Sequence, residues 1–202
     1  SDVFLIDLAS NQISRASEGH NGVEGNGPSN NGFVSDNGRF VTFQSLASNL
    51  VGTDQNSHWD VYLRDLLGDR TTRVSIGTGQ KEPDGDSRTC GISNDGRFIL
   101  YESDASNLVM RDNNQTTDVF IFRRQPESVS RVSIGADGKE LEGGWHGVWM
   151  SSNGNIVALG SAVASERSDL AQVTLFRNLG TGMTSNDEPM KPTAQPAMYT
   201  AR

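Results

Sequence analysis

Two short segments of the chain carry side chains in the spacing of a cation-binding loop. Each segment has Asp at its first and seventh positions and Asn at its third. With the fifth residue included, the candidates are Asp54, Asn56, His58 and Asp60 in one segment and Asp112, Asn114, Thr116 and Asp118 in the other. Calcium takes six to eight oxygen ligands, and alternate residues of a tight loop can turn side chains and one carbonyl toward a common centre. The spacing therefore predicts Ca2+ as a cofactor at both segments.

These residues also have a purely structural interpretation. Asp and Asn side chains accept hydrogen bonds from their own backbone in the turns that precede strands. Neither segment has the glycine that eases the turn of a fuller calcium loop. The sequence leaves both interpretations open.

Three glutamates recur at a fixed interval and are candidates for ligand binding. The residue numbers of Glu24, Glu82 and Glu140 increase in equal steps of 58. Either these glutamates line a central channel that attracts a cation or a basic peptide, or they are solvated charges on loops.

Tryptophans offer a second kind of candidate ligand site. Trp145 and Trp149 form the densest aromatic cluster of the sequence, and Trp59 directly follows His58. Such side chains either stack on sugar rings, which would make the chain carbohydrate-binding, or fill the space between sheets.

Catalysis has little support in the residue pattern. The three histidines, His20, His58 and His146, lack the spacing of a zinc site, and the sequence has no nucleophile elbow. Pairs of loop carboxylates, such as Glu82 with Asp84, are the remaining alternative for a hydrolase. We therefore expect a chain that is not itself an enzyme.

Composition argues against two classes of partner. The formal net charge is −8 and no Lys/Arg cluster forms a stripe, so nucleic acid is not an expected partner. No apolar run approaches the roughly 18 residues of a membrane span, and no signal peptide is expected. Cys90 is the only cysteine, so no disulfide is expected within the chain.

The candidate residues belong to a sequence repeat whose period is the same step that separates the glutamates. Gly-Arg-Phe at 38–40 returns at 96–98, and Ala-Ser-Asn-Leu-Val at 47–51 returns at 105–109. Three arginines keep the same interval, each followed two residues later by serine: Arg15, Arg73 and Arg131. A fixed period is typical of folds in which each unit buries its apolar face against the next.

Each full repeat predicts four short antiparallel strands, the first two joined by a tight turn that ends in glycine. Such units fit the blades of an all-β propeller. We expect a propeller segment over 1–183 and a flexible, proline-containing tail over 184–202. The segment would comprise the end of one blade, two full blades and a partial blade, over 2–17, 30–76, 88–134 and 146–178. In the partial blade, Gln172–Arg177 would be the third strand, preceded by a shorter loop than in the second repeat.

The repeat resembles a known family. Ser-Asn-Asp-Gly-Arg at 93–97, Asn-Leu-Val at 107–109 and Asp-Val-Phe at 118–120 are similar to the TolB-like propeller repeat, a WD40-like, PD40-type unit. The resemblance implies a bacterial periplasmic or secreted protein. In this family propellers serve as docking platforms, as domains attached to peptidases and as ligand-binding modules.

The predicted strands are too few to close a ring, since propellers usually need four or more blades. We therefore expect an incomplete ring, completed by a protein partner or by a second copy of the chain in an oligomer.

The long loops of such blades emerge on one face, so binding is predicted there. These loops span 18–29, 45–59, 77–87, 103–117 and 135–144. The first functional hypothesis is a non-catalytic platform for protein interaction or ligand binding, stabilised by calcium. The alternatives are one chain of a propeller hydrolase whose active site a missing half completes, and a carbohydrate-binding propeller.

Overall fold

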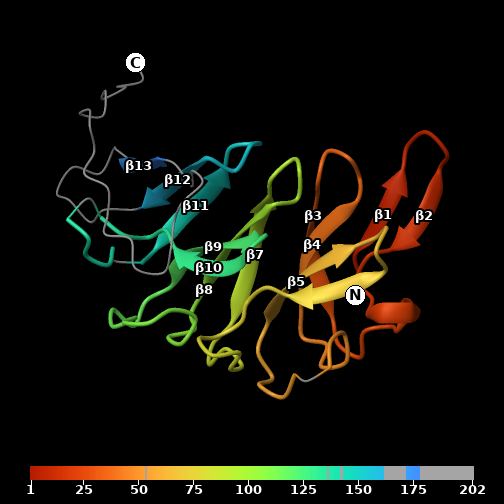
Figure 1. The fold of residues 1–202 in the computed structure, drawn as a ribbon, viewed down its shortest axis with the longest axis horizontal. Coiled ribbons are helices and arrows are strands. Elements are labelled where there is room, and N and C mark those ends of the chain that lie inside the picture. Colours follow the sequence, from red (N-terminus) through yellow and green to blue (C-terminus); the bar gives the residue numbers. More distant parts are fainter. Residues whose placement is uncertain (53, 136, 142, 162–171, 178–202) are drawn as a thin grey trace.

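Four antiparallel sheets follow one another along the chain in the computed structural model, which describes residues 1–52, 54–135, 137–141, 143–161 and 172–177 (Figure 1). We number these sheets as blades. Blade 1 contains β1 (Phe4–Asp7) and β2 (Gln12–Arg15). Blade 2 contains β3 (Ser29–Val34), β4 (Phe40–Ser45), β5 (Asp60–Asp65) and β6 (Arg70–Arg73). Blade 3 contains β7 (Ser87–Ile92), β8 (Phe98–Ser103), β9 (Asp118–Arg124) and β10 (Glu127–Arg131). Blade 4 contains β11 (Trp145–Met150), β12 (Ile156–Ser161) and β13 (Gln172–Arg177).

The predicted fold class is confirmed. Blades 2 and 3 each pair their four strands antiparallel and in chain order. The described residues contain no α-helix, only the 3-10 turn η1 (His20–Gly22) between blades 1 and 2. The blades stand side by side in an open row rather than a closed ring (Figure 1). The tail predicted over 184–202 lies outside the described residues.

Blade 4 follows the register of blade 3 although its sequence match is weak. Ile156 of β12 pairs with Arg177 of β13, as Phe98 of β8 pairs with Arg123 of β9. β13 therefore holds the place of a third strand, as the sequence predicted.

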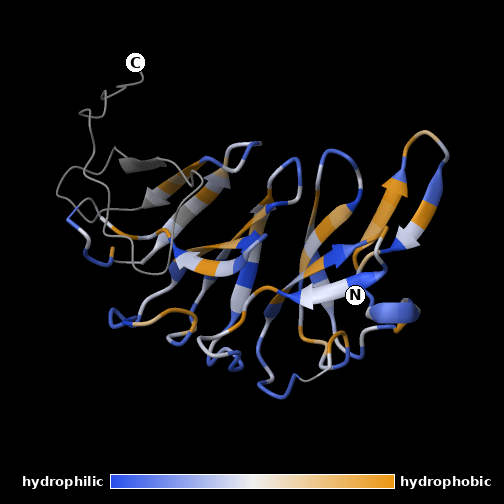
Figure 2. Cartoon of the chain, viewed as in Figure 1, coloured by the Kyte–Doolittle hydropathy of each residue, from blue (hydrophilic) through white to orange (hydrophobic). Residues whose placement is uncertain are grey.

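Both faces of an internal blade are buried against neighbouring blades. Successive residues of a strand point to opposite faces. In β5, Val61 and Leu63 pack with blade 3, whereas Tyr62 packs on the other face with Val3 of blade 1; Val61, Leu63 and Tyr62 are at most 4% exposed. Figure 2 shows the matching pattern, with hydrophobic residues along the strands and mainly polar residues in the loops.

The tight turns of successive blades touch one another at one end of the molecule, the top of Figure 1. The Asp36 amide donates to the Asn94 carbonyl (3.1 Å), and the Asn94 amide donates to the Ser152 carbonyl (2.7 Å). Gly96 lies directly over the ring of Phe40 in the preceding blade. Backbone hydrogen bonds and this glycine contact together set the spacing between blades.

The longer connections lie together at the opposite end, which we call the loop face (Figure 1). It includes the β4–β5 loop of blade 2, the β8–β9 loop of blade 3 and the loops that join consecutive blades. In the described part of the chain, no helix has the length and apolar character to cross a membrane.

Two equivalent glycines test the contact between turns. Gly96 and Gly38 both have φ = +68°, but a β-carbon at Gly96 would overlap Phe40, whereas one at Gly38 would meet no atom within 4 Å. Gly38→Ala carries only the backbone strain, about 1 kcal/mol. We expect Gly96→Ala to lower the free energy of unfolding by about 1–3 kcal/mol more than Gly38→Ala, measured by urea denaturation. Equal losses would show that the contact with Phe40 adds nothing to stability.

Candidate functional site

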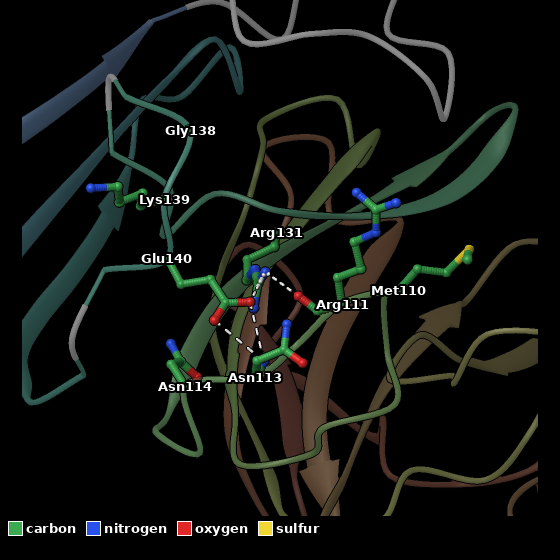
Figure 3. Close-up of a pocket in the computed structure, with 8 residues that line it drawn as sticks. All are labelled: Met110, Arg111, Asn113, Asn114, Arg131, Gly138, Lys139 and Glu140. Atoms are coloured by element: carbon green, nitrogen blue, oxygen red, sulfur yellow. Dashed lines mark hydrogen bonds and ion pairs between the residues drawn. The ribbon is translucent and has the colours of Figure 1, made fainter.

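The predicted calcium segment of blade 3 lies on the loop face, where its carboxylates surround an arginine. Nη1 of Arg131, at the end of β10, lies 3.3 Å from Asp112 and 3.0 Å from Asp118. Its Nη2 donates to Glu140 at 2.7 Å (Figure 3). The Arg131 side chain is only 8% exposed. One guanidinium thus joins β10, the β8–β9 loop, the start of β9 and the loop between blades.

Blade 2 repeats this arrangement one period earlier in the sequence. Nη1 of Arg73 lies 3.6 Å from Asp54, 3.2 Å from Asp60 and 3.6 Å from Glu82. Tyr62 adds a hydroxyl that donates to Asp54 at 2.6 Å, whereas blade 3 has Phe120 at the equivalent position. We call the two sets the arginine clusters.

Blade 1 contains only part of a cluster. Arg15 lies 2.6 Å from Glu24, and Asp2 holds the position that Asp60 holds in blade 2. The Glu24 side chain is 74% exposed, so this pair is open to water. Each of the three glutamates that recur in equal steps along the sequence therefore pairs with the arginine of its own repeat.

The arginine clusters hold more negative than positive charge. One guanidinium faces three carboxylates, which gives a formal charge of −2 if all of them are ionised. Burial, with the nearby charge of Asp54, raises the pKa of Asp60 to about 6, against the opposing hydrogen bond from Ser75 and the charge of Arg73. Burial and the charge of Asp118 raise the pKa of Asp112 to about 6. Each cluster therefore favours the uptake of a proton or of another cation.

The other predicted ligands make hydrogen bonds typical of Asx turns. Oδ1 of Asn56 accepts from the His58 amide (2.9 Å), and Oδ1 of Asn114 accepts from the Thr116 amide (3.3 Å). The His58 ring pairs through Nδ1 with Asp86 at 3.0 Å. Within the described ranges, no group of three or more His, Cys, Asp or Glu residues is arranged to hold a metal ion. As arranged, these residues do not fit a calcium ion, because the guanidinium takes the centre; calcium binding stays a prediction.

The structure separates the three tryptophans. Trp145 packs with the core between blades 3 and 4, and its Nε1 donates to the Thr117 carbonyl at 2.9 Å. The ring of Trp149 lies close against Gly147 of its own strand, and Trp149 is 59% exposed. Trp59 is half-buried at the start of β5, and its amide donates to Asp86. Carbohydrate binding stays a prediction, and Trp149 is the tryptophan most open to a sugar.

Sequence reasoning missed the residues at the centre of this site. Arg73 and Arg131 stood out only as markers of the repeat. Arg73 and Arg131 are separated by the same 58 residues as Glu82 and Glu140. This shared interval was the signal that each arginine pairs with the glutamate of its own repeat.

Comparison with known proteins identifies the fold. The chain is similar to the structure described as putative TolB from Agrobacterium tumefaciens, with a TM-score of 0.50 and 20% identity over 88% of this chain and 53% of that one. It is also similar to the tricorn protease, with a TM-score of 0.51 and 12% identity over 88% of this chain and 20% of that one. The fold is that of a TolB-like β-propeller.

TolB from Acinetobacter baumannii is another match, with a TM-score of 0.49 and 16% identity over 88% of this chain. The chain spans 38%, 53% and 20% of the length of the Acinetobacter, Agrobacterium and tricorn structures. No family model matches the sequence. No curated protein matches it either. The likenesses to the Agrobacterium and tricorn structures establish the TolB-like propeller fold alone.

Removal of a cluster arginine would leave buried carboxylates without a partner. We expect Arg131→Met to lower the free energy of unfolding by about 3 kcal/mol, because breaking a buried ion pair leaves uncompensated charge. Arg15→Met is the matched control, since among the described residues Arg15 forms an ion pair only with Glu24, which is exposed. Urea denaturation of both variants would measure the difference. Equal losses would contradict a special role for the buried cluster.

Calcium binding has a direct test. An ion bound only by the folded chain must raise the midpoint of thermal unfolding in millimolar calcium relative to chelator. If calcium binds at the arginine clusters, this rise should disappear in the double variant Asp54→Asn with Asp112→Asn. Equal midpoints for the unaltered chain in calcium and in chelator would contradict the calcium prediction.

Proposed function

We propose that this chain is a segment of a non-catalytic propeller that acts as a protein-interaction platform, with its ring completed by further blades of the same repeat. A second copy of the chain or a separate partner would supply them. The observation that carries this proposal is the exposure, at both ends of the row, of positions that are buried between internal blades. A periplasmic or secreted location belongs to the same proposal and rests on the family resemblance.

The outer face of blade 1 is the first such surface. Phe4 and Ile6 of β1 are each 53% exposed, and Ile13 of β2 is 66% exposed. The residues at the equivalent positions of blade 3 are Phe120, Phe122 and Val129, which pack against blade 2. The face of blade 1 thus has the chemistry of a contact between blades.

The outer face of blade 4 is the second surface. Ile156 is 46% exposed, and Trp149 is exposed on the same sheet. In the two preceding repeats the position of Ile156 is held by Phe40 and Phe98, which lie under the turn glycines Gly96 and Gly154 of the next blade. A further blade would cover Ile156 in the same way.

These two faces are complementary to each other. One carries the residues that a blade turns toward its predecessor, and the other carries the residues that a blade turns toward its successor. Burial of apolar surface stabilises by about 25 cal/mol per Å2, so such faces favour association.

The loop face is the surface that we propose for partner binding. The arginine clusters hold four chain segments together in each of blades 2 and 3, so the loops are fixed by buried contacts. A surface fixed before binding loses less conformational entropy when a partner binds.

The native mass in solution tests the completion of the ring. We expect light scattering to give a particle heavier than the 21.8 kDa chain, with intact mass spectrometry showing a second copy or another chain. Ile6→Glu should return the particle toward the mass of a single chain, because it places a charge in the proposed contact.

Leu67→Glu is the matched control for that measurement. Leu67 is 78% exposed in the turn between β5 and β6 and lies on neither end face, so its change should leave the mass unaltered. A wild-type particle of 21.8 kDa would contradict the proposal, as would equal effects of the two substitutions.

A further inference from the structure

One edge of β1 has no neighbouring strand. In blades 2 and 3 the third strand pairs on both sides, with β5 between β4 and β6 and β9 between β8 and β10. β1 pairs only with β2, and among the described residues no strand lies along its other edge (Figure 1). A free edge presents N–H and C=O groups that can pair with another strand. Blade 1 therefore has open strand positions beside β1.

β1 lies where the third strand of a blade lies. The Ser29 amide donates to the Ser1 carbonyl at 2.8 Å, which matches the bond from the Ser87 amide to the Trp59 carbonyl at the next junction, 2.7 Å. The sequence agrees, since Asp-Val-Phe at 2–4 repeats the first three residues of β9. The open positions beside β1 are therefore those of a β-hairpin like β3–β4 or β7–β8.

Phe4 of β1 lacks the aromatic neighbour that its counterparts have. In blade 2 the ring of Phe43 stacks on Tyr62, and in blade 3 the ring of Tyr101 stacks on Phe120, each pair with 5.7 Å between ring centroids. These four side chains are fully buried, whereas Phe4, at the position equivalent to Tyr62 and Phe120, is 53% exposed. An aromatic residue in the second strand of a hairpin would cover Phe4, and stacked aromatic pairs add to the stabilisation that burial gives.

The turn of blade 2 lacks the phenylalanine that the later turns cover. Gly96 and Gly154 lie over Phe40 and Phe98 of the preceding blade. A β-carbon at the equivalent Gly38 would meet no atom within 4 Å. A hairpin whose second strand begins with phenylalanine would place that ring under Gly38.

The side of blade 2 next to this turn is also open. Val34 is 48% exposed, whereas the equivalent Ile92 of blade 3 packs in one core with Phe40 of blade 2. The Asp36 amide donates to the Asn94 carbonyl of the next blade, so the Asp36 carbonyl is the equivalent acceptor for the turn of a preceding hairpin. The edge of β1, the ring of Phe4 and this side of blade 2 thus fit the same element.

We propose that the edge of β1 binds a β-hairpin of a partner chain, built on the pattern of the repeat's own first two strands. The second strand of the hairpin pairs antiparallel with β1, with a phenylalanine under Gly38, an aromatic residue on Phe4 and a serine opposite Asp2, as the registers of blades 2 and 3 require. Main-chain hydrogen bonds give such strand addition its affinity, and the alternate side chains give its specificity. The inference rests on the proposed function, since it names the element that completes blade 1.

A second copy of this chain fits the edge less well than a separate partner does. Its hairpin β11–β12 has Ile156 and Leu159 where β4 and β8 have phenylalanine and the stacked aromatic residue. The strand that would have to pair with β1, β12, already pairs with β13. The hairpin that fits carries both aromatic residues and has the edge of its second strand free.

Hydrogen exchange and fluorescence anisotropy test this site. The probe is a synthetic, fluorescein-labelled peptide with the sequence of residues 87–103 and Cys90→Ser, which copies the β7–β8 hairpin without its thiol. We expect the peptide to bind the intact chain. At saturation it should slow exchange of the amides of Phe4–Asp7 at least about tenfold, because paired amides exchange only when the structure opens locally.

Variants of the peptide test the predicted contacts. Tyr101→Ala removes the ring that would stack on Phe4 and should weaken binding about tenfold. Arg88→Ala is the matched control and should leave the affinity unchanged. Blade 2 has Asn30 at the position of Arg88, and both residues are exposed.

Variants of the chain localise the binding. Phe4→Ala should weaken binding of the peptide about tenfold, because it removes the other ring of the same pair. Gly38→Ala should weaken it as well, because a β-carbon there would meet the phenylalanine of the hairpin, as one at Gly96 would meet Phe40. Leu67→Ala is the matched control, since Leu67 is 78% exposed in the turn between β5 and β6.

Three results would overturn the proposal. They are unchanged exchange of the β1 amides at saturating peptide, equal affinity for the unaltered peptide and its Tyr101→Ala variant, and equal effects of Phe4→Ala and Leu67→Ala. If the β1 amides are already protected before peptide is added, intact mass spectrometry decides. A second, different chain in the particle then supports the proposal, and a particle of this chain alone overturns it.

The native mass keeps this inference separate from the proposed function. A particle of 21.8 kDa that binds the peptide contradicts the completed ring and supports the hairpin site. A heavier particle whose β1 amides exchange freely and that does not bind the peptide supports the completed ring and removes the hairpin site.

Discussion

Neither face of a blade in this propeller can be buried without a neighbouring blade. The strands alternate apolar residues toward the blade before and the blade after, as Tyr62 and Leu63 do in β5. This two-sided requirement explains why one repeat is copied along the chain and why the turn glycines Gly96 and Gly154 sit over a phenylalanine of the preceding blade. It also explains the exposed apolar residues at the two ends of the row.

The same stacking leaves the polar ends of the blades to be organised by electrostatics. In blades 2 and 3 a buried arginine joins loops that the strands alone would leave independent. Buried ion pairs repay little of their desolvation cost, so the clusters contribute more to the specific arrangement of the loops than to net stability. Burial and the excess negative charge of the clusters are the physical reasons for the raised pKa values of Asp60 and Asp112.

The repeat made the fold predictable from the sequence. Gly-Arg-Phe at 38–40 and 96–98 located the turns, and even the shortened third unit placed β13 correctly, since Gln172 pairs with Ser161 as Asp118 does with Ser103. The candidate site was predicted only in part. The spacing within each segment identified the carboxylates. It did not identify the central Arg131, which lies in β10 whereas Asp118 lies in β9, because local spacing does not show contacts between different strands. The contact between Asn113 and Glu140 depends on how two loops approach each other, which the sequence pattern does not encode.

The fluorescence of Trp149 can report whether the outer face of blade 4 is exposed to water or covered. Trp149 lies close against Gly147 and is 59% exposed on the outer face of blade 4, whereas Trp145 is packed toward blade 3. An indole emits at shorter wavelength when water leaves its environment. Coverage of that outer face would therefore change the emission of Trp149, while Trp145 and the half-buried Trp59 contribute a constant background, so the chain carries an intrinsic fluorescent reporter at one of its two open ends.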